Sequence, residues 1–200
     1  MIQTIFGSPI VILKSNNTKE LFSDEIYHEI VDYMMTSDNR FVDHPYARGG
    51  KICTTDLNTT ISKKINRLNT LLEFLKETGL KYAYLYSDQP IIDLQFYNMW
   101  INLSFQGCEI KNHYDRYHDD YEKSLVILFY PKAPIGGANL VFIHNSEYGD
   151  WIENYSENDL VRIGIEEGDI VIIDNSVLHA VDTHNAVDPR MCVAVEFRLV

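Results

Sequence analysis

The sequence predicts a mainly β fold, an antiparallel β-sandwich braced by two N-terminal helices, within one domain covering residues 1–200. Three observations predict it. Helical apolar periodicity is confined to residues 1–80, and beyond them β-branched and aromatic residues follow period-two stretches between turn residues. Strands and helices do not alternate as they would in a parallel sheet. Residues 1–80 are therefore the predicted helical support, and residues 81–200 the predicted core.

The N-terminal segment predicts a strand pair followed by a helix. Apolar runs at residues 2–6 and 10–13 are separated by Gly7-Ser8-Pro9, a turn signal. Apolar residues then recur every three to four positions from Leu21 to Met35, which is typical of an amphipathic helix. Residues 36–58 show no period, so we expect a long loop that acts as a lid or faces substrate.

The second helix has the clearest pattern in the chain. Thr59 or Thr60 supplies its cap, Gly79 its end, and one apolar stripe runs along it: Ile61, Ile65, Leu68, Leu72 and Leu75. Strands are then expected at residues 81–86, 91–105, 124–130, 139–143, 161–165, 169–174 and 191–199.

Composition excludes several classes of partner. The formal net charge of -12 disfavours nucleic acids and anionic membranes, which are themselves negative. The three cysteines have no metal-knuckle or disulfide spacing, which fits a reducing compartment and core packing. No leader-like or membrane-spanning apolar segment is visible, so we expect a soluble, cytoplasmic protein.

One histidine pair and a carboxylate suit a metal site. His113 and Asp115 are two residues apart at the end of an extended run, so their side chains share a face. His179 follows a buried strand, and we expect it to reach the same place from the opposite sheet. Two imidazoles and one carboxylate favour iron(II), with open coordination positions. His118 and Asp120 repeat the spacing, so local pattern alone leaves the ligand pair open.

Arg190 opens the last predicted strand, eleven residues after His179. A strand that crosses the site from there places a guanidinium in the same pocket, where it can bind a carboxylate with two hydrogen bonds. Arg198 is the alternative anion binder, but it lies near the chain end, where solvation is expected.

An ordered series of landmarks carries a family resemblance: Trp100-Ile101-Asn102, Gly107, His113-Tyr114-Asp115, residues 124–130, Gly136-Gly137 with residues 138–142, residues 168–171, Leu178-His179 and Arg190. Residues 95–199 resemble the Fe(II)/2-oxoglutarate-dependent dioxygenases. They are most similar to the prolyl-hydroxylase-like branch and to small oxygenases of bacteria and tailed phages. The resemblance implies a double-stranded β-helix, which is a jelly-roll, cupin-like core.

The resemblance also implies roles for single residues. His113, Asp115 and His179 are the implied iron ligands, because the interval from Trp100 matches His113 rather than His118. Arg190 is the implied partner of the distal carboxylate of 2-oxoglutarate. Further co-substrate contacts are implied for Asn102, Tyr130 and Ser124, and the glycine pair is needed for its turn.

The implied activity is hydroxylation of a prolyl or other amino-acid side chain, in a peptide or free, with dioxygen. Similar enzymes that halogenate lack a carboxylate at the position of Asp115. The chain departs from the family at Asp174-Asn175-Ser176 and Asp119-Asp120, which leaves the substrate open. Two alternatives remain: a non-catalytic jelly-roll protein that binds a metal or ligand, and a zinc or manganese enzyme on a cupin-like scaffold, which leaves Arg190 without a task.

Overall fold

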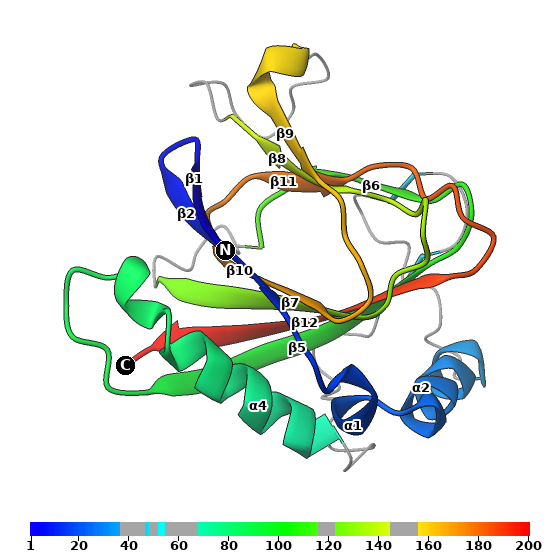
Figure 1. The fold of residues 1–200 in the computed structure, drawn as a ribbon, viewed down its shortest axis with the longest axis horizontal. Coiled ribbons are helices and arrows are strands. Elements are labelled where there is room, and N and C mark those ends of the chain that lie inside the picture. The colour runs from blue at the N-terminus through cyan, green and yellow to red at the C-terminus, as the bar shows by residue number, and fades with distance from the viewer. Residues whose placement is uncertain (37–46, 49–51, 55–67, 116–122, 145–155) are drawn as a thin grey trace.

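A computed structural model of the chain describes residues 1–36, 47–48, 52–54, 68–115, 123–144 and 156–200. Its described strands form two facing antiparallel sheets (Figure 1). The large sheet has the order β1-β2-β10-β7-β12-β5-β4, and the small sheet the order β3-β6-β11-β8-β9. The predicted antiparallel sandwich is therefore confirmed.

The large sheet is built from β1 (Ile2–Ile5), β2 (Ser8–Lys14), β4 (Ile52–Thr54), β5 (Leu94–Ser104), β7 (Ser124–Lys132), β10 (Asp169–Asp174) and β12 (Arg190–Leu199). The small sheet contains β3 (Ala47–Arg48), β6 (Glu109–His113), β8 (Leu140–Ile143), β9 (Leu160–Ile163) and β11 (His179–Val181). The helical elements are α1 (Thr18–Leu21), α2 (Asp24–Thr36), α4 (Leu68–Leu80), and the 3₁₀ turns η1 (Ala83–Leu85) and η2 (Glu157–Asp159).

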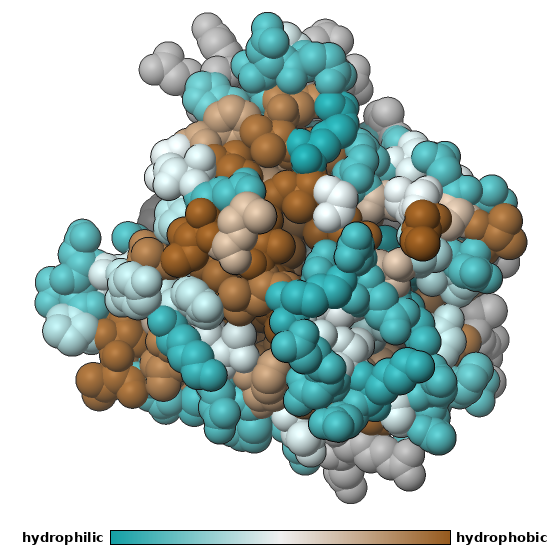
Figure 2. Space-filling view, viewed as in Figure 1, coloured by the Kyte–Doolittle hydropathy of each residue, from teal (hydrophilic) through white to brown (hydrophobic). Residues whose placement is uncertain are grey.

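Each face of the large sheet buries its own core, because side chains alternate along a strand. On the outer face, α2 and α4 pack against residues such as Ile127, Val193 and Val195. The inner face, with Val171 and Ala194, packs against the small sheet. The outward sides of α1 and α2 are hydrophilic, as their amphipathic patterns require (Figure 2). No helix among the described residues is long and apolar enough to cross a membrane.

The two helices and most strands were predicted, with shifted ends. The first helix begins later, at Asp24, after the separate turn α1. The second is described only from Leu68, so its predicted first part, residues 59–67, lies outside the described residues. The loop predicted at residues 36–58 contains the short strands β3 and β4, which pair with β6 and β5.

The strand predicted at residues 81–86 is wrong. The chain leaves α4 through consecutive turns in which Tyr82, Leu85 and Tyr86 each donate a backbone hydrogen bond to the carbonyl three residues earlier. That spacing buries Ala83 and Tyr86 together against the outer core, with the Tyr86 hydroxyl donating to the carbonyl of Ile172. The alternating tyrosines that suggested a strand therefore belong to a 3₁₀ turn.

Candidate metal centre and its surroundings

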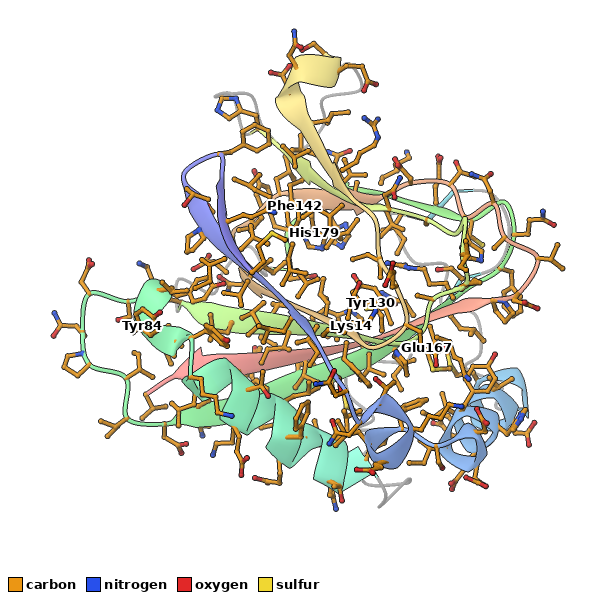
Figure 3. The ribbon with its side chains drawn as sticks, viewed as in Figure 1. Lys14, Tyr84, Tyr130, Phe142, Glu167 and His179 are labelled. Atoms are coloured by element: carbon orange, nitrogen blue, oxygen red, sulfur yellow. The ribbon has the colours of Figure 1, made fainter. Side chains whose placement is uncertain are left out.

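Neighbouring strands of the small sheet carry the three predicted metal ligands. His113 ends β6, Asp115 follows two residues later, and His179 begins β11, where it pairs directly with His113. The expectation that His179 arrives from the opposite sheet is wrong, because β11 lies between β6 and β8 of the same sheet. Figure 3 shows His179 in the space between the two sheets.

A β-bulge turns His113 toward this space. Between the pairs His179–His113 and Val181–Ile110, β11 advances two residues while β6 advances three. The extra residue reverses the alternation on β6. His113 therefore faces inward although it lies three residues from Ile110, which packs in the inner core. Simple alternation along β6 would place these two side chains on opposite faces.

Both imidazoles are held by the same kind of hydrogen bond. Nδ1 of His113 lies 2.8 Å from the carbonyl oxygen of Lys111, and Nδ1 of His179 lies 2.9 Å from that of Val177. A carbonyl only accepts, so each Nδ1 carries the proton and donates it. In a neutral ring this leaves the Nε2 lone pair available for a metal, with the ring orientation fixed by the backbone.

The three ligand atoms converge on one point. Nε2 of His113 lies 3.8 Å from Oδ1 of Asp115, and Nε2 of His179 lies 3.6 Å from Oδ2. These distances are too long for hydrogen bonds. They are within the roughly 4.4 Å that an ion bonded at about 2.2 Å to each atom can span. All three ligand atoms lie within 4.8 Å of one another.

The carboxyl group in this cluster is buried, which is unusual for an ionisable side chain. The Asp115 side chain is only 6% exposed. Burial raises its pKa above the ordinary value, and the electrostatic interaction with His179 offsets part of that rise. A divalent cation offsets the cost of burying the carboxylate. With two imidazoles and one carboxylate, the donor set fits iron(II) and leaves further coordination positions for ligands.

Across the interior, the large sheet presents a buried guanidinium. Arg190 begins β12, is 2% exposed, and stacks over the Tyr130 ring at 4.7 Å from its centroid. Its Nε and Nη2 atoms have no hydrogen-bond partner among the described residues. A buried charge with unsatisfied donors is costly, and an anionic ligand that accepts two hydrogen bonds removes that cost.

Two polar side chains accompany Arg190 on the inner face. Ser104 pairs directly with Arg190, and Asn102 pairs with Cys192, two residues further along β12. Within the described part of the chain, Oγ of Ser104 and Oδ1 of Asn102 also lack hydrogen-bond partners. The sequence reasoning selected Asn102 but missed Ser104. Period two along β5 contained the signal, because it places positions 102 and 104 on one face.

Tyr130 and Cys192 lie within electrostatic reach of both the guanidinium and Asp115. Burial raises the pKa of the Tyr130 phenol well above its ordinary value, and it raises that of the Cys192 thiol to about 11. The charges of both Arg190 and Asp115 act on each of the two groups. Figure 3 shows Tyr130 on the large-sheet side of the interior, across from His179. Tyr130 therefore lies on the inner face, and its contact with the co-substrate stays a prediction.

Ser124 does not lie beside Arg190. It pairs with Arg198, at the opposite end of β12, and its hydroxyl donates to Oε1 of Glu196. Arg198 itself is partly buried, with its guanidinium 4.1 Å from the centroid of the Tyr97 ring. The other predicted co-substrate contacts, Asn102 and Tyr130, share the inner face with Arg190.

The glycine pair has the conformational role expected of it. Gly136 has a φ of +75°, and a Cβ on Gly137 would lie 3.2 Å from the ring of His184. His184 lies in the connection between β11 and β12 and is fully buried. His118 and Asp120, the alternative ligand pair, lie outside the described residues.

No family model matches the chain, and no curated protein matches it. Solved structures, in contrast, do match the chain. A collagen prolyl hydroxylase of Paramecium Bursaria Chlorella virus-1, in complex with 2-oxoglutarate, superposes with a TM-score of 0.57 at 12% identity over 96% of each chain. The α-ketoglutarate-dependent carbocyclase SnoK gives 0.65 at 12% identity, over 94% of this chain and 79% of that one.

HygX from Streptomyces hygroscopicus, with nickel, 2-oxoglutarate and hygromycin B bound, gives a TM-score of 0.57 at 13% identity, over 96% of this chain and 83% of that one. Likeness of this extent at such low identity establishes the fold. The chain has the double-stranded β-helix fold of the 2-oxoglutarate–Fe(II) oxygenases, as the resemblance in its sequence implied.

Proposed function

We propose that this protein is a non-haem Fe(II)- and 2-oxoglutarate-dependent dioxygenase that hydroxylates a prolyl or other amino-acid side chain, in a peptide or free. One observation carries the proposal. Two Nε2 atoms and a buried carboxylate converge on one point between the sheets, and a buried guanidinium with unsatisfied donors lies on the facing wall. The solved structures of similar fold include complexes with 2-oxoglutarate.

Each residue then has a defined task. His113, Asp115 and His179 hold the iron, and their backbone hydrogen bonds keep both imidazoles in the ligating tautomer. Arg190 binds the distal carboxylate of 2-oxoglutarate, assisted by the hydroxyl of Ser104 and the amide of Asn102. Bound iron would supply the oxidative chemistry with dioxygen, and the apolar residues of the inner core around it would limit the access of water.

Tyr130 orients the guanidinium. Its ring lies against Arg190, and its phenol stays protonated because burial raises its pKa. A protonated phenol remains a hydrogen-bond donor toward an anionic co-substrate. A zinc or manganese enzyme of the same fold gives no role to this group of polar residues around Arg190.

The test separates binding from turnover. Calorimetry without oxygen measures binding of 2-oxoglutarate to the iron(II)-loaded protein, and succinate formation with oxygen measures turnover. The native protein is expected to do both. His179→Ala is expected to lose iron binding and succinate formation, whereas His28→Ala, at an exposed helix position, keeps them.

Native protein that binds iron but neither binds nor consumes 2-oxoglutarate would favour a non-catalytic binding protein instead. A His179→Ala protein that still formed succinate would contradict the assigned ligand. Metal analysis of protein purified without added metal distinguishes iron from zinc and manganese.

A further inference from the structure

A cavity of about 400 Å³ lies against the two chain segments that connect the large sheet to the metal ligands. Its described walls are residues 7–9 of the β1–β2 turn, residues 84–88 of η1 and its exit, Lys123, and residues 174–176. Lys123 ends the segment that leaves β6 through Asp115, and residues 174–176 begin the segment that ends at His179. The volume falls within the roughly 300–1,000 Å³ of small-molecule sites.

Charges of both signs line this cavity. Lys123 contributes an ammonium group, and Asp88 and Asp174 contribute carboxylates. None of the three makes an ion pair with another described residue, so these charges do not neutralise one another. The backbone N–H of Ser176 donates to Oδ1 of Asp174 at 2.8 Å, which holds that carboxylate in its turn. Separated opposite charges in one cavity are complementary to a ligand that carries both.

A free amino acid has such a pair of charges. Its α-ammonium donates hydrogen bonds to carboxylates, and its α-carboxylate accepts them from an ammonium group such as that of Lys123. A residue inside a peptide has lost both charges and gains nothing from this wall. Tyr84, which is 65% exposed, adds an aromatic surface to the cavity (Figure 3).

The position of the cavity suits a substrate of the metal centre. Ser176 is three residues before His179, at most about 11 Å along an extended chain. The side chain of an amino acid held in the cavity can therefore extend toward the metal ligands. Arg190 begins β12 and lines no described part of the cavity, so a co-substrate bound to Arg190 leaves the cavity for another molecule.

We infer that this cavity binds the α-groups of a free amino acid, with Asp88 and Asp174 on its ammonium and Lys123 on its carboxylate. The inference rests on the proposed function and narrows its substrate to a free amino acid rather than a residue in a peptide. It also gives a task to the turn of residues 174–176, where the chain departs from the family it resembles.

Free and blocked amino acids test the inference by calorimetry without oxygen, on protein loaded with iron(II) and 2-oxoglutarate. Each common L-amino acid is compared with its Nα-acetyl derivative, which lacks the ammonium, and with its α-amide, which lacks the carboxylate. We expect at least one free amino acid to bind about fivefold or more tightly than either derivative, the effect of one ion pair at a partly exposed site. If no free amino acid binds more tightly than its blocked forms, the inference is overturned.

Single charges of the cavity account for separate halves of this preference. Lys123→Met is expected to bind the free acid and its amide equally, while still rejecting the Nα-acetyl form. The double variant Asp88→Asn with Asp174→Asn is expected to do the reverse, and its amide oxygen at position 174 still accepts from Ser176. Lys81→Met and Glu77→Gln remove the same charges from exposed positions outside the cavity and are expected to change nothing. Cavity variants that keep both preferences would contradict the assigned contacts.

Failure of the proposed function would be seen separately. Binding of 2-oxoglutarate to the iron(II)-loaded protein is measured first, and the cavity variants are expected to bind it as tightly as the native protein does. If the native protein does not bind it, the proposed function fails. The amino-acid titrations, repeated on protein without co-substrate, still decide whether the cavity selects both α-groups.

Discussion

Replacing Arg190 with methionine separates binding of an anion from support of the fold. The guanidinium is 2% exposed, and two of its nitrogens lack hydrogen-bond partners among the described residues. Two hydrogen bonds to a carboxylate, at about 1.5–3 kcal/mol each, are worth roughly 3–6 kcal/mol. Arg190→Met is therefore expected to weaken 2-oxoglutarate binding by at least about 100-fold.

Without ligand, Arg190→Met is expected to have a higher free energy of unfolding than the native protein. Replacing buried charge by apolar side chains of similar volume often stabilises a protein, by about 1–4 kcal/mol. Loss of the contact with the Tyr130 ring costs about 0.5–2 kcal/mol. The first effect wins, so the ligand-free variant is expected to melt a few degrees higher, at about 2–4 °C per kcal/mol for a chain of this size.

Thermal unfolding with and without 2-oxoglutarate measures both effects, using metal-loaded protein without oxygen. The native protein is expected to gain stability from the ligand by mass action, and Arg190→Met to gain none. A variant that is destabilised without ligand would mean that the guanidinium supports the fold. A variant that still gains stability from 2-oxoglutarate would place its carboxylate elsewhere.

Three further predictions follow from single side chains. Ser104→Ala is expected to weaken 2-oxoglutarate binding about tenfold or more, while Ser124→Ala leaves it unchanged; equal effects in calorimetry would contradict this. Burial raises the Cys192 pKa from 9.0 to about 11, so the folded state holds the thiol proton more tightly. The contribution of this thiol to the free energy of unfolding is fully present below pH 9 and is lost as the pH rises through about 11. The free energy of unfolding measured in urea should therefore fall less steeply with rising pH in Cys192→Ala than in the native protein. Gly137→Ala is expected to lower the free energy of unfolding by about 1–3 kcal/mol, because its Cβ would lie 2.9 Å from the Pro134 carbonyl oxygen and would also crowd the His184 ring; an unchanged free energy of unfolding would contradict this.

The sequence was most informative where local chemistry decides structure. The apolar stripe of α4 and the alternation along β5, β7 and β12 predicted their elements, because each buries one side against a continuous core. The spacing of His113 and Asp115 made them one of two candidate ligand pairs, and the resemblance selected them over His118 and Asp120. The fold as a whole followed from the resemblance, and the solved structures confirm it.

Features that depend on strand pairing could not be read in advance. Nothing local to His179 shows that β11 lies beside β6, because the pairing joins segments far apart in the chain. Period two along β5 puts Ser104 on the face of Asn102, but only the register of β12 shows that Ser104 rather than Ser124 lies beside Arg190. Tertiary pairing therefore decided which of the two serines accompanies the guanidinium.

The metal centre requires the β-bulge in β6. The inner core needs Ile110 inside, and the metal centre needs His113 inside, yet three residues separate them. A regular strand meets one requirement and fails the other. The extra residue satisfies both, and the adjacent Lys111 carbonyl accepts the Nδ1 proton of His113. The same irregularity therefore aims the imidazole and fixes its tautomer, so the bulge is part of the metal site rather than a defect of the sheet.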